Sequence, residues 1–239
     1  HVSYIINYGP VGYHPVSNPA GGVTITSTTN FVTVGGLTPL SEYCFWVRSI
    51  CNNGDTSVWE GPICGRTGCP GDFKLPYSQS YTTYLPDCWT EAQGRLGTTN
   101  TTFTSTTSSS WNPGIFTSAG TNYGANLQIY GTGTDEWLIS PSINFGNNPT
   151  MYRVLEFDYA LTETGSSNLG TFGSDDSVAI VISLDNGITW NKTNIADVWD
   201  ATSIISAGSN HFAHYFQATG KVKFGFYAAS SINNACVAR

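Results

Sequence analysis

Five acidic residues stand at the ends of predicted strands or in loops, and their carboxylates are the kind of group that binds calcium: Asp135, Glu136, Asp158, Asp175 and Asp176. Calcium takes six to eight oxygen ligands from carboxylates, carbonyls and water. Two interpretations therefore stay open, a structural calcium site or turn capping by solvated carboxylates. The sequence has no compact D-x-D-x-D-G loop that would decide between them.

Residues that could make or break bonds are present without the spacing that catalysis needs. Asp87, Glu91, Glu156 and Glu163 could supply a glycosidase carboxylate pair, but no spacing selects any two of them. The motifs G-x-S-x-G and HExxH are absent, as is a phosphate-binding glycine-rich loop. We therefore expect no enzyme activity from this chain.

The chain contains six cysteines and no CxxC motif, which favours disulfides in an oxidising compartment over a zinc or redox site. A hairpin folded about Gly54 places Cys44 opposite Cys64. We therefore predict a cross-strand disulfide between Cys44 and Cys64. A Cα separation above about 7 Å would exclude it.

The segment from Ser183 to Trp190 fits the pattern S-x-D-x-G-x-T-W, known as the Asp box. We expect Asp185 to accept hydrogen bonds from backbone amides of the turn, Gly187 to take a positive φ, and Trp190 to pack underneath. The motif therefore predicts a structural hairpin. A sialidase would need several copies and an arginine cluster, which this chain does not have.

Three aromatic residues of the first half could form a contact surface for sugar or protein: Trp46, Trp59 and Tyr13. Alternation along 43–48 points Trp46 outward if Phe45 points inward. Large aromatic rings with a polar end are common at binding surfaces. The alternative is that Arg48 stacks on Trp46, or that a neighbouring domain covers it.

Composition indicates a folded β protein that does not bind nucleic acid. Hydrophobic residues make up 40% of the 239 residues and charged residues only 10%, and the net charge is −7. A chain with nine basic residues and no basic stripe is a poor partner for nucleic acid or an anionic membrane. No apolar run is long enough for a transmembrane helix.

Residues 1–68 show short alternating runs separated by turn residues, including predicted strands at 23–25 and 31–34. The spacing of Leu37, Pro39 and Tyr43 is typical of a tyrosine corner, in which the phenol bonds to an upstream backbone group. With these features the segment resembles part of a fibronectin type III domain. The first two strands of that family are missing, so we expect the chain to be a piece of a longer protein.

We expect residues 69–76 to form a linker, because proline and glycine interrupt both helices and strands. Residues 77–239 form a second region of alternating strands, with no closing strand evident in 231–239. The expected core residues of this region are Trp89, Trp111, Leu127, Ile129, Trp137, Leu138, Ile139, Val154, Leu155, Phe157, Tyr159, Val178, Ile180, Ile182, Val222, Phe224 and Phe226.

Three segments of this second region carry a resemblance to a known family: 77–90, 135–143, and 155–159 with 176–190. In this order and spacing they resemble the cleaved-adhesin jelly rolls of secreted Bacteroidetes proteins, which are related in shape to MAM domains. Gingipain adhesin domains and modules of gliding-motility adhesins belong to this group. The resemblance implies a jelly-roll β-sandwich that often holds a structural calcium.

The sequence thus predicts an all-β chain, with a partial fibronectin type III sandwich at 1–68 and a jelly roll at 77–239. We expect a non-catalytic adhesion module of a larger bacterial protein that binds extracellular proteins or polysaccharides. The resemblance implies export to the cell surface by the type IX secretion machinery of the outer membrane. The alternative is an accessory module of a secreted peptidase or glycoside hydrolase.

Overall fold

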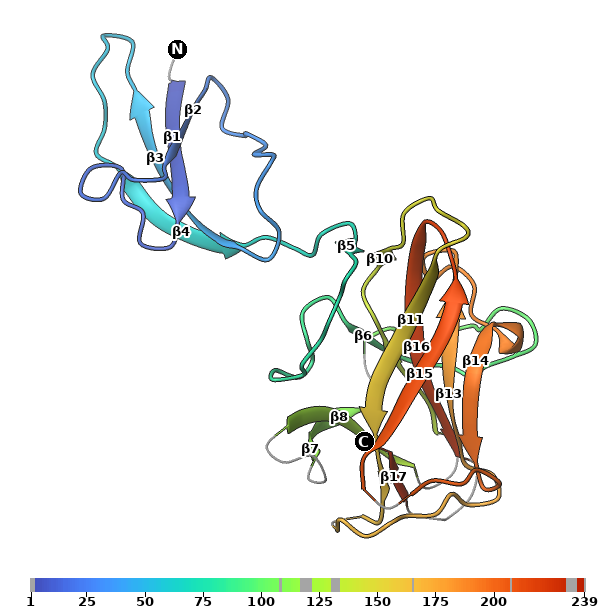
Figure 1. Cartoon of the computed structure of the whole chain (residues 1–239). Coiled ribbons are helices and arrows are strands. Elements are labelled where there is room, and N and C mark those ends of the chain that lie inside the picture. The colour runs from blue at the N-terminus through green and yellow to red at the C-terminus, as the bar shows by residue number, and fades with distance from the viewer. Residues whose placement is uncertain are drawn as a thin grey trace. The chain divides into compact units, whose positions relative to one another are not determined.

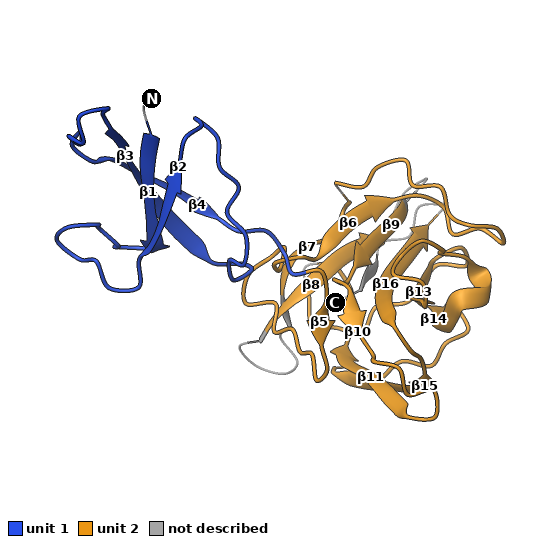
Figure 2. Ribbon diagram, turned by 90° about the horizontal axis from the view of Figure 1, so that it is seen from above, with its two compact units in different colours: residues 1–70 blue, residues 71–239 orange. Residues whose placement is uncertain are grey.

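The computed structural model describes residues 3–107, 109–116, 122–129, 134–164, 166–206, 208–230 and 236–238. The chain divides into two compact units, His1–Pro70 and Gly71–Arg239, which Figure 2 shows in blue and orange. Strands dominate both units, and the one helical turn among the described residues is a short 3₁₀ segment, Lys192–Asn194. The predicted all-β fold class is confirmed. None of the described residues forms a helix that could span a membrane.

The first unit is a single antiparallel sheet of four strands in the order β2-β1-β3-β4 (Figure 1). Its strands are β1 (Ser3–Pro10), β2 (Val23–Ser27), β3 (Glu42–Ile50) and β4 (Glu60–Arg66). Ile6 lies opposite Ile25 on one side and Val47 on the other, so apolar side chains line up across the sheet. The predicted strand at 31–34 is wrong, because these residues pair with no strand and Phe31 is 75% exposed.

The tyrosine corner lies where the sequence predicts it. The backbone N–H of Thr38 donates to the Tyr43 hydroxyl oxygen over 3.1 Å. Hydrogen bonding by the side chain of Thr38, and then by its backbone N–H, favours the phenolate and lowers the pKa of Tyr43 below its ordinary value. The ring of Tyr8 stacks on Phe45 at 5.4 Å and meets Tyr43 edge-on at 6.2 Å. These contacts fix the β1–β3 pair at the centre of the sheet.

One face of this sheet stays open in the described part of the first unit. Val23, Val47 and Ile63 are 45%, 38% and 77% exposed, although each lies on the same face as the Tyr8 and Phe45 rings. The described residues form one layer, whereas the fibronectin type III resemblance implies packing of two layers. That resemblance is therefore not supported by the architecture seen here.

The second unit contains one large sheet in which β14, β13 and β16 lie side by side. Beyond β16, the pairs β9–β6 and β10–β5 extend the sheet along different stretches of that strand. The strands are β5 (Phe73–Lys74), β6 (Thr90–Gln93), β9 (Thr134–Ile139), β10 (Ile143–Asn144), β13 (Ser177–Ser183), β14 (Ile195–Asp200) and β16 (Lys221–Ser230).

The opposing layer of the second unit consists of two smaller sheets (Figure 1). Their strands are β7 (Asn112–Phe116), β8 (Asn122–Ile129), β12 (Leu161–Thr162) and β17 (Cys236–Ala238) in one, and β11 (Tyr152–Tyr159) and β15 (Asn210–Gln217) in the other. The β11–β15 ribbon packs on the large sheet, since Phe157 meets Phe226 at 5.3 Å and Trp199 meets Phe212 at 5.3 Å. The unit is therefore a β-sandwich with a layer made of two parts.

Two predicted boundaries need correction. Residues 73–74 were predicted as linker, yet they form β5, which pairs in parallel with β10 and belongs to the second unit. An ion pair of 3.1 Å between Asp72 and Lys221 fixes the same stretch. No strand was expected in 231–239, but β17 lies between β12 and β8. Both strands are too short for an alternation pattern to reveal them.

Most of the predicted core is buried as expected. Trp137, Leu127, Ile129 and Val222 are completely covered. Leu155, Phe157, Tyr159 and Phe226 are only half-buried. Val154 is 43% exposed and lies on the outer face of β11. Its neighbours on the strand take the inner face because side chains alternate.

The Asp box forms the predicted hairpin after β13. Asp185 Oδ1 accepts from the amides of Ile188 and Thr189 over 3.1 and 2.9 Å and from the Ser183 hydroxyl over 2.7 Å. Gly187 has φ = +85°, and the Trp190 ring beneath the turn is 2% exposed. The turn is therefore a local structural element, as the sequence predicts.

Candidate functional site

A cavity of about 610 Å³ lies inside the second unit, between its two layers. Leu138, Val178 and Ile180 line it from the large sheet, and Leu161 and Ala125 line it from the opposing layer. Eight aromatic residues complete the wall: Tyr81, Trp111, Tyr123, Phe157, Tyr159, Phe172, Trp199 and Phe226. Sites for small ligands are typically concave, mostly apolar and about 300–1,000 Å³ in volume. This cavity is the best candidate for a functional site in the chain.

The aromatic wall is held in place by contacts among its own members. The Trp199 indole N–H donates to the Tyr159 hydroxyl over 3.0 Å, and the two ring centroids are 4.9 Å apart. Phe157 meets Trp199 and Phe226 edge-on at 6.4 and 5.3 Å. Edge-on and tilted ring pairs are favourable arrangements, so the wall is formed before any ligand enters.

Trp111 is the one residue of the wall whose indole N–H is buried without a partner in the described part of the chain. Its side chain is 7% exposed. A buried donor without an acceptor costs about 1–3 kcal/mol.

Two carboxylates hold the segment that carries Trp111. Glu91 Oε2 accepts from the amide of Ser109 over 3.1 Å, and Glu136 Oε2 accepts from the amide of Ser110 over 2.9 Å. Glu136 Oε1 also accepts from the Ser110 hydroxyl and from the Gln93 side-chain amide. Because Glu136 is only 4% exposed, this network fixes the wall of the cavity to strand β9.

Two further carboxylates lie on the strand that borders the cavity, but on its outer face. Glu156 and Asp158 lie two residues apart on β11, and their side chains are about 60% exposed. His211 on β15 places Nδ1 at 2.9 Å from Asp158 and Nε2 at 3.9 Å from Glu156. Side chains alternate along β11, so Glu156 and Asp158 lie on the same outer face as Val154, whereas Phe157 and Tyr159 face the cavity.

The five acidic residues predicted as calcium ligands do not come together. Glu136 accepts bonds from protein donors, Asp135 accepts from the Tyr227 hydroxyl, and Asp158 pairs with His211. Asp175 and Asp176 precede β13, and Asp176 accepts from the amide of Gly173 over 2.8 Å. Within the described ranges, no three His, Cys, Asp or Glu side chains form a group that could hold a metal ion. The five residues do not fit one calcium site, and calcium binding stays a prediction from sequence.

Burial and carboxylate neighbours suppress ionisation of two tyrosines in the second unit. Burial raises the pKa of Tyr227, and the hydrogen bond to Asp135 raises it further. Burial and a hydrogen bond to Glu91 raise the pKa of Tyr84 in the same way. Both hydroxyls therefore stay protonated near neutral pH and act as hydrogen-bond donors to carboxylates.

Tyr13 does not belong to an exposed aromatic surface, which corrects the prediction from sequence. Its side chain is 5% exposed and packs against Gly9 and Gly22, where a Cβ atom would approach the Tyr13 ring to 2.6 and 2.1 Å. Its hydroxyl accepts from the side-chain amide of Asn7 over 3.0 Å. The ring is buried because two glycines leave space for it.

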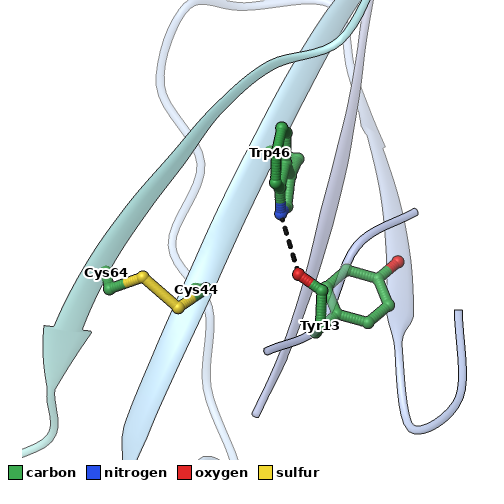
Figure 3. Close-up of a disulfide and its surroundings, with 4 residues drawn as sticks. All are labelled: Tyr13, Cys44, Trp46 and Cys64. Atoms are coloured by element: carbon green, nitrogen blue, oxygen red, sulfur yellow. Dashed lines mark hydrogen bonds between the residues drawn. A yellow bond between two sulfur atoms is a disulfide. The ribbon is translucent and has the colours of Figure 1, made fainter. Parts of the chain in front are cut away.

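The two tryptophans of the first unit are partly exposed but already have partners. The Trp46 indole N–H donates to the backbone oxygen of Tyr13 over 3.1 Å (Figure 3), and its ring meets His14 at 4.4 Å. Arg48 stacks on Trp59, with its guanidinium carbon 4.6 Å from the ring centroid, and not on Trp46. The structure therefore does not join Tyr13, Trp46 and Trp59 in one exposed patch.

Cys44 and Cys64 form the predicted cross-strand disulfide, with a Cα separation of 4.0 Å (Figure 3). They lie directly opposite each other on β3 and β4. Cys69 and Cys88 are also disulfide-bonded, whereas Cys51 is an exposed free thiol. The side chain of Cys236 lies outside the described residues.

Sequence reasoning placed Trp111, Phe157 and Tyr159 in the core without seeing that they border a cavity. It did not single out Trp199 or Phe172. The signal that was available is the large number of aromatics in 77–239 relative to the small number of strands that could bury them. Whether such rings fill a core or line a cavity depends on how the layers pack, which alternation does not encode.

Comparisons with known proteins leave the family open. No family model matches the chain, and no curated protein matches it. Among solved structures, the chain is similar to the K1 cleaved adhesin domain of Lys-gingipain from Porphyromonas gingivalis W83. The identity is 13%, the match covers 67% of this chain and 92% of that domain, and the TM-score is 0.40.

Proposed function

We propose that this chain is a non-catalytic adhesion module of a secreted or cell-surface bacterial protein, and that the cavity of the second unit is its ligand site. The cavity carries the proposal. Its volume is that of a small-ligand site, and its aromatic wall is already held by contacts between Trp199, Tyr159 and Phe157. A site that is formed in advance loses little free energy to ordering on binding.

The chemistry of the wall favours a polysaccharide as the ligand. Flat aromatic rings pack well against the C–H faces of sugar rings, and the remaining polar groups can bond to hydroxyls. The lining also includes the hydroxyl-bearing residues Ser80, Thr82 and Tyr159, whose hydroxyls can donate and accept. A sugar hydroxyl both donates and accepts, so it can satisfy either kind of group.

The carboxylates of the second unit support binding better than hydrolysis. Glu91 and Glu136 accept bonds from the backbone amides of Ser109 and Ser110. Glu156 and Asp158 lie on the same face of one strand. A glycosidase needs an acid and a second carboxylate that flank the scissile bond from two sides. Neither pair has that arrangement.

The disulfides support an extracellular location, since such bonds persist in oxidising compartments. We include export by the type IX route and attachment to the cell surface in the proposal, on the sequence resemblance alone. Protein ligands remain part of the proposal on the same basis.

Affinity electrophoresis in gels that contain soluble polysaccharides tests the ligand site. Ala125 lies on the inner side of β8 and lines the cavity, so the Ala125→Phe variant fills part of it. We expect at least one polysaccharide to retard the wild-type chain and not this variant. Gln128→Phe adds the same ring at an exposed position of the same strand and is the matched control.

Equal retardation of wild type and Ala125→Phe would place binding outside the cavity. Circular dichroism of the variant shows whether the fold is kept. The length distribution of the polysaccharide after incubation tests the non-catalytic assignment, which predicts no shortening. Shortening that Ala125→Phe abolishes would show that the cavity is an active site.

A further inference from the structure

The outer face of the β11–β15 ribbon carries a group of exposed apolar side chains at one end. The two strands lie side by side (Figure 1), and side chains alternate between their inner and outer faces. Tyr152 and Tyr215 on the outer face are 67% and 66% exposed, and Val154 lies directly opposite Tyr215. Single exposed apolar side chains are common, whereas a group of them indicates an interaction site.

The other end of the same face is acidic. Glu156 and Asp158 follow Val154 on β11, and His211 of β15 lies opposite Asp158 with Nδ1 2.9 Å from its carboxylate. Glu156 makes no hydrogen bond within the described residues, and its ionic neighbour is His211 Nε2 at 3.9 Å. The outward positions of the two strands include no lysine or arginine. Glu156 is therefore available to a cation from outside the chain.

We propose that this outer face docks a basic segment of another polypeptide, with apolar side chains against the two tyrosines and a lysine or arginine at Glu156. Charge complementarity favours such a partner, because the chain has 16 acidic and nine basic residues. Tyrosine is enriched at protein interfaces, and its ring face also attracts cations. This surface is separate from the cavity, so the inference goes beyond the proposed function.

A second copy of this chain fits the face less well than a basic partner does. In a twofold contact the same surface meets itself, so every side chain it offers comes from the outward positions of β11 and β15. Those positions carry no lysine or arginine, and Glu156 and Asp158 would stay without a cationic partner. The net charge of −7 adds repulsion between two copies.

A neutral polysaccharide also fits less well. It has no charge to pair with Glu156, and Val154 beside the two tyrosines offers no flat ring for a sugar to stack on. A polypeptide segment can present apolar side chains and a cation along one extended strand. The polysaccharide alternative is an outcome of the experiment below.

Three peptides of eight residues test the charge preference with the full chain as receptor, because an extended peptide of this length spans the eight-residue strands. Each alternates valine and threonine in its first half. The second half alternates threonine with lysine, with serine or with glutamate. Fluorescence anisotropy of labelled peptides measures the affinities. We expect the lysine peptide to bind about tenfold more tightly than the serine peptide, and the glutamate peptide to bind most weakly.

One double variant removes the acidic end of the face. Glu156→Gln combined with Asp158→Asn should reduce the affinity for the lysine peptide to that for the serine peptide, and leave the serine peptide unchanged. Glu42→Gln combined with Glu60→Gln removes two exposed charges from the first unit and is the matched control. It should change none of the three affinities.

A second double variant removes the apolar end. Tyr152→Ser combined with Tyr215→Ser should weaken all three peptides without lowering the melting temperature, because both rings are exposed. Ile188→Ser removes another exposed apolar side chain of the second unit, in the turn after β13, and should leave the affinities unchanged. Ala125→Phe alters the cavity and should also bind the peptides as wild type does.

The possible outcomes separate this inference from the function proposed for the cavity. Equal affinities for the lysine and glutamate peptides, or binding that survives the Tyr152 and Tyr215 substitutions, would overturn the docking face and leave the cavity function standing. Absence of peptide binding would overturn it too. It would give way to a polysaccharide surface if wild type, but not the tyrosine variant, sediments with insoluble polysaccharide. A dimer in ultracentrifugation that the tyrosine variant abolishes would show that a second copy covers the face.

Discussion

At the scale of single residues, the chain uses its few charged groups as hydrogen-bond acceptors. Asp185 is the example that the sequence predicts best, because all partners of its carboxylate lie within four positions along the chain. Burial alone would raise the pKa of Asp185, but hydrogen bonds from Ser183, Thr189 and Ile188 outweigh it and hold the pKa below its ordinary value.

We expect Asp185→Ala to lower the free energy of unfolding by about 1–2 kcal/mol at pH 7, since three bonds to an exposed carboxylate are lost. The lowered pKa gives the sign of the pH dependence. The contribution of the Asp185 charge to the free energy of unfolding is present above the pKa of Asp185 in the unfolded state. It is lost as pH falls through the pKa of Asp185 in the folded state. Urea unfolding should therefore show the gap between wild type and Asp185→Asn closing below about pH 4. A gap that widens at low pH would contradict this role.

Other residues show where local reasoning ends. Tyr13 looked exposed because nothing next to it in sequence predicts a pocket, yet Gly9 and Gly22 together leave space for its ring. Cys44 and Cys64 were predictable because a single hairpin brings them together. Burial that depends on several loops cannot be read from alternation.

At the scale of elements, alternation predicts the strands and most of the inner faces, but not the register between layers. Trp111 and Leu127 were expected in the core and are buried. The position of Trp111 at a cavity depends on Glu136, a buried carboxylate on a different strand, 25 residues further along the chain. The sequence left Glu136 as either a calcium ligand or a solvated turn-capping carboxylate, because a carboxylate beside Asp135 has the same appearance in either role.

We expect Glu136→Ala to lower the free energy of unfolding by about 1–3 kcal/mol, because the buried carboxylate no longer accepts hydrogen bonds from Ser110 and Gln93. Glu163→Ala removes an exposed carboxylate and should change stability by less than about 0.5 kcal/mol. Urea unfolding followed by tryptophan fluorescence measures both. Equal stabilities of the two variants would show that Glu136 does not hold the wall of the cavity.

At the scale of the whole molecule, two units with different architectures share one chain. The first is a single sheet in the described residues, and one disulfide cross-links two neighbouring strands of it. The second buries a larger core yet retains a cavity between its layers. Composition predicts the all-β class because Thr, Ser and Gly replace charged residues throughout. The cavity could not be predicted, because it results from the packing of β11, β8 and β13 across long stretches of sequence.

The central claim is that a ligand enters the cavity of the second unit. The indole N–H resonances of the seven tryptophans, recorded by ¹⁵N NMR during titration with oligosaccharides of a polysaccharide that retards the wild-type chain, test it most directly. The account predicts that the signals of Trp111 and Trp199 shift, while those of Trp46 and Trp59 in the first unit stay in place. Shifts confined to Trp46 and Trp59, or no shifts at any tryptophan, would contradict it.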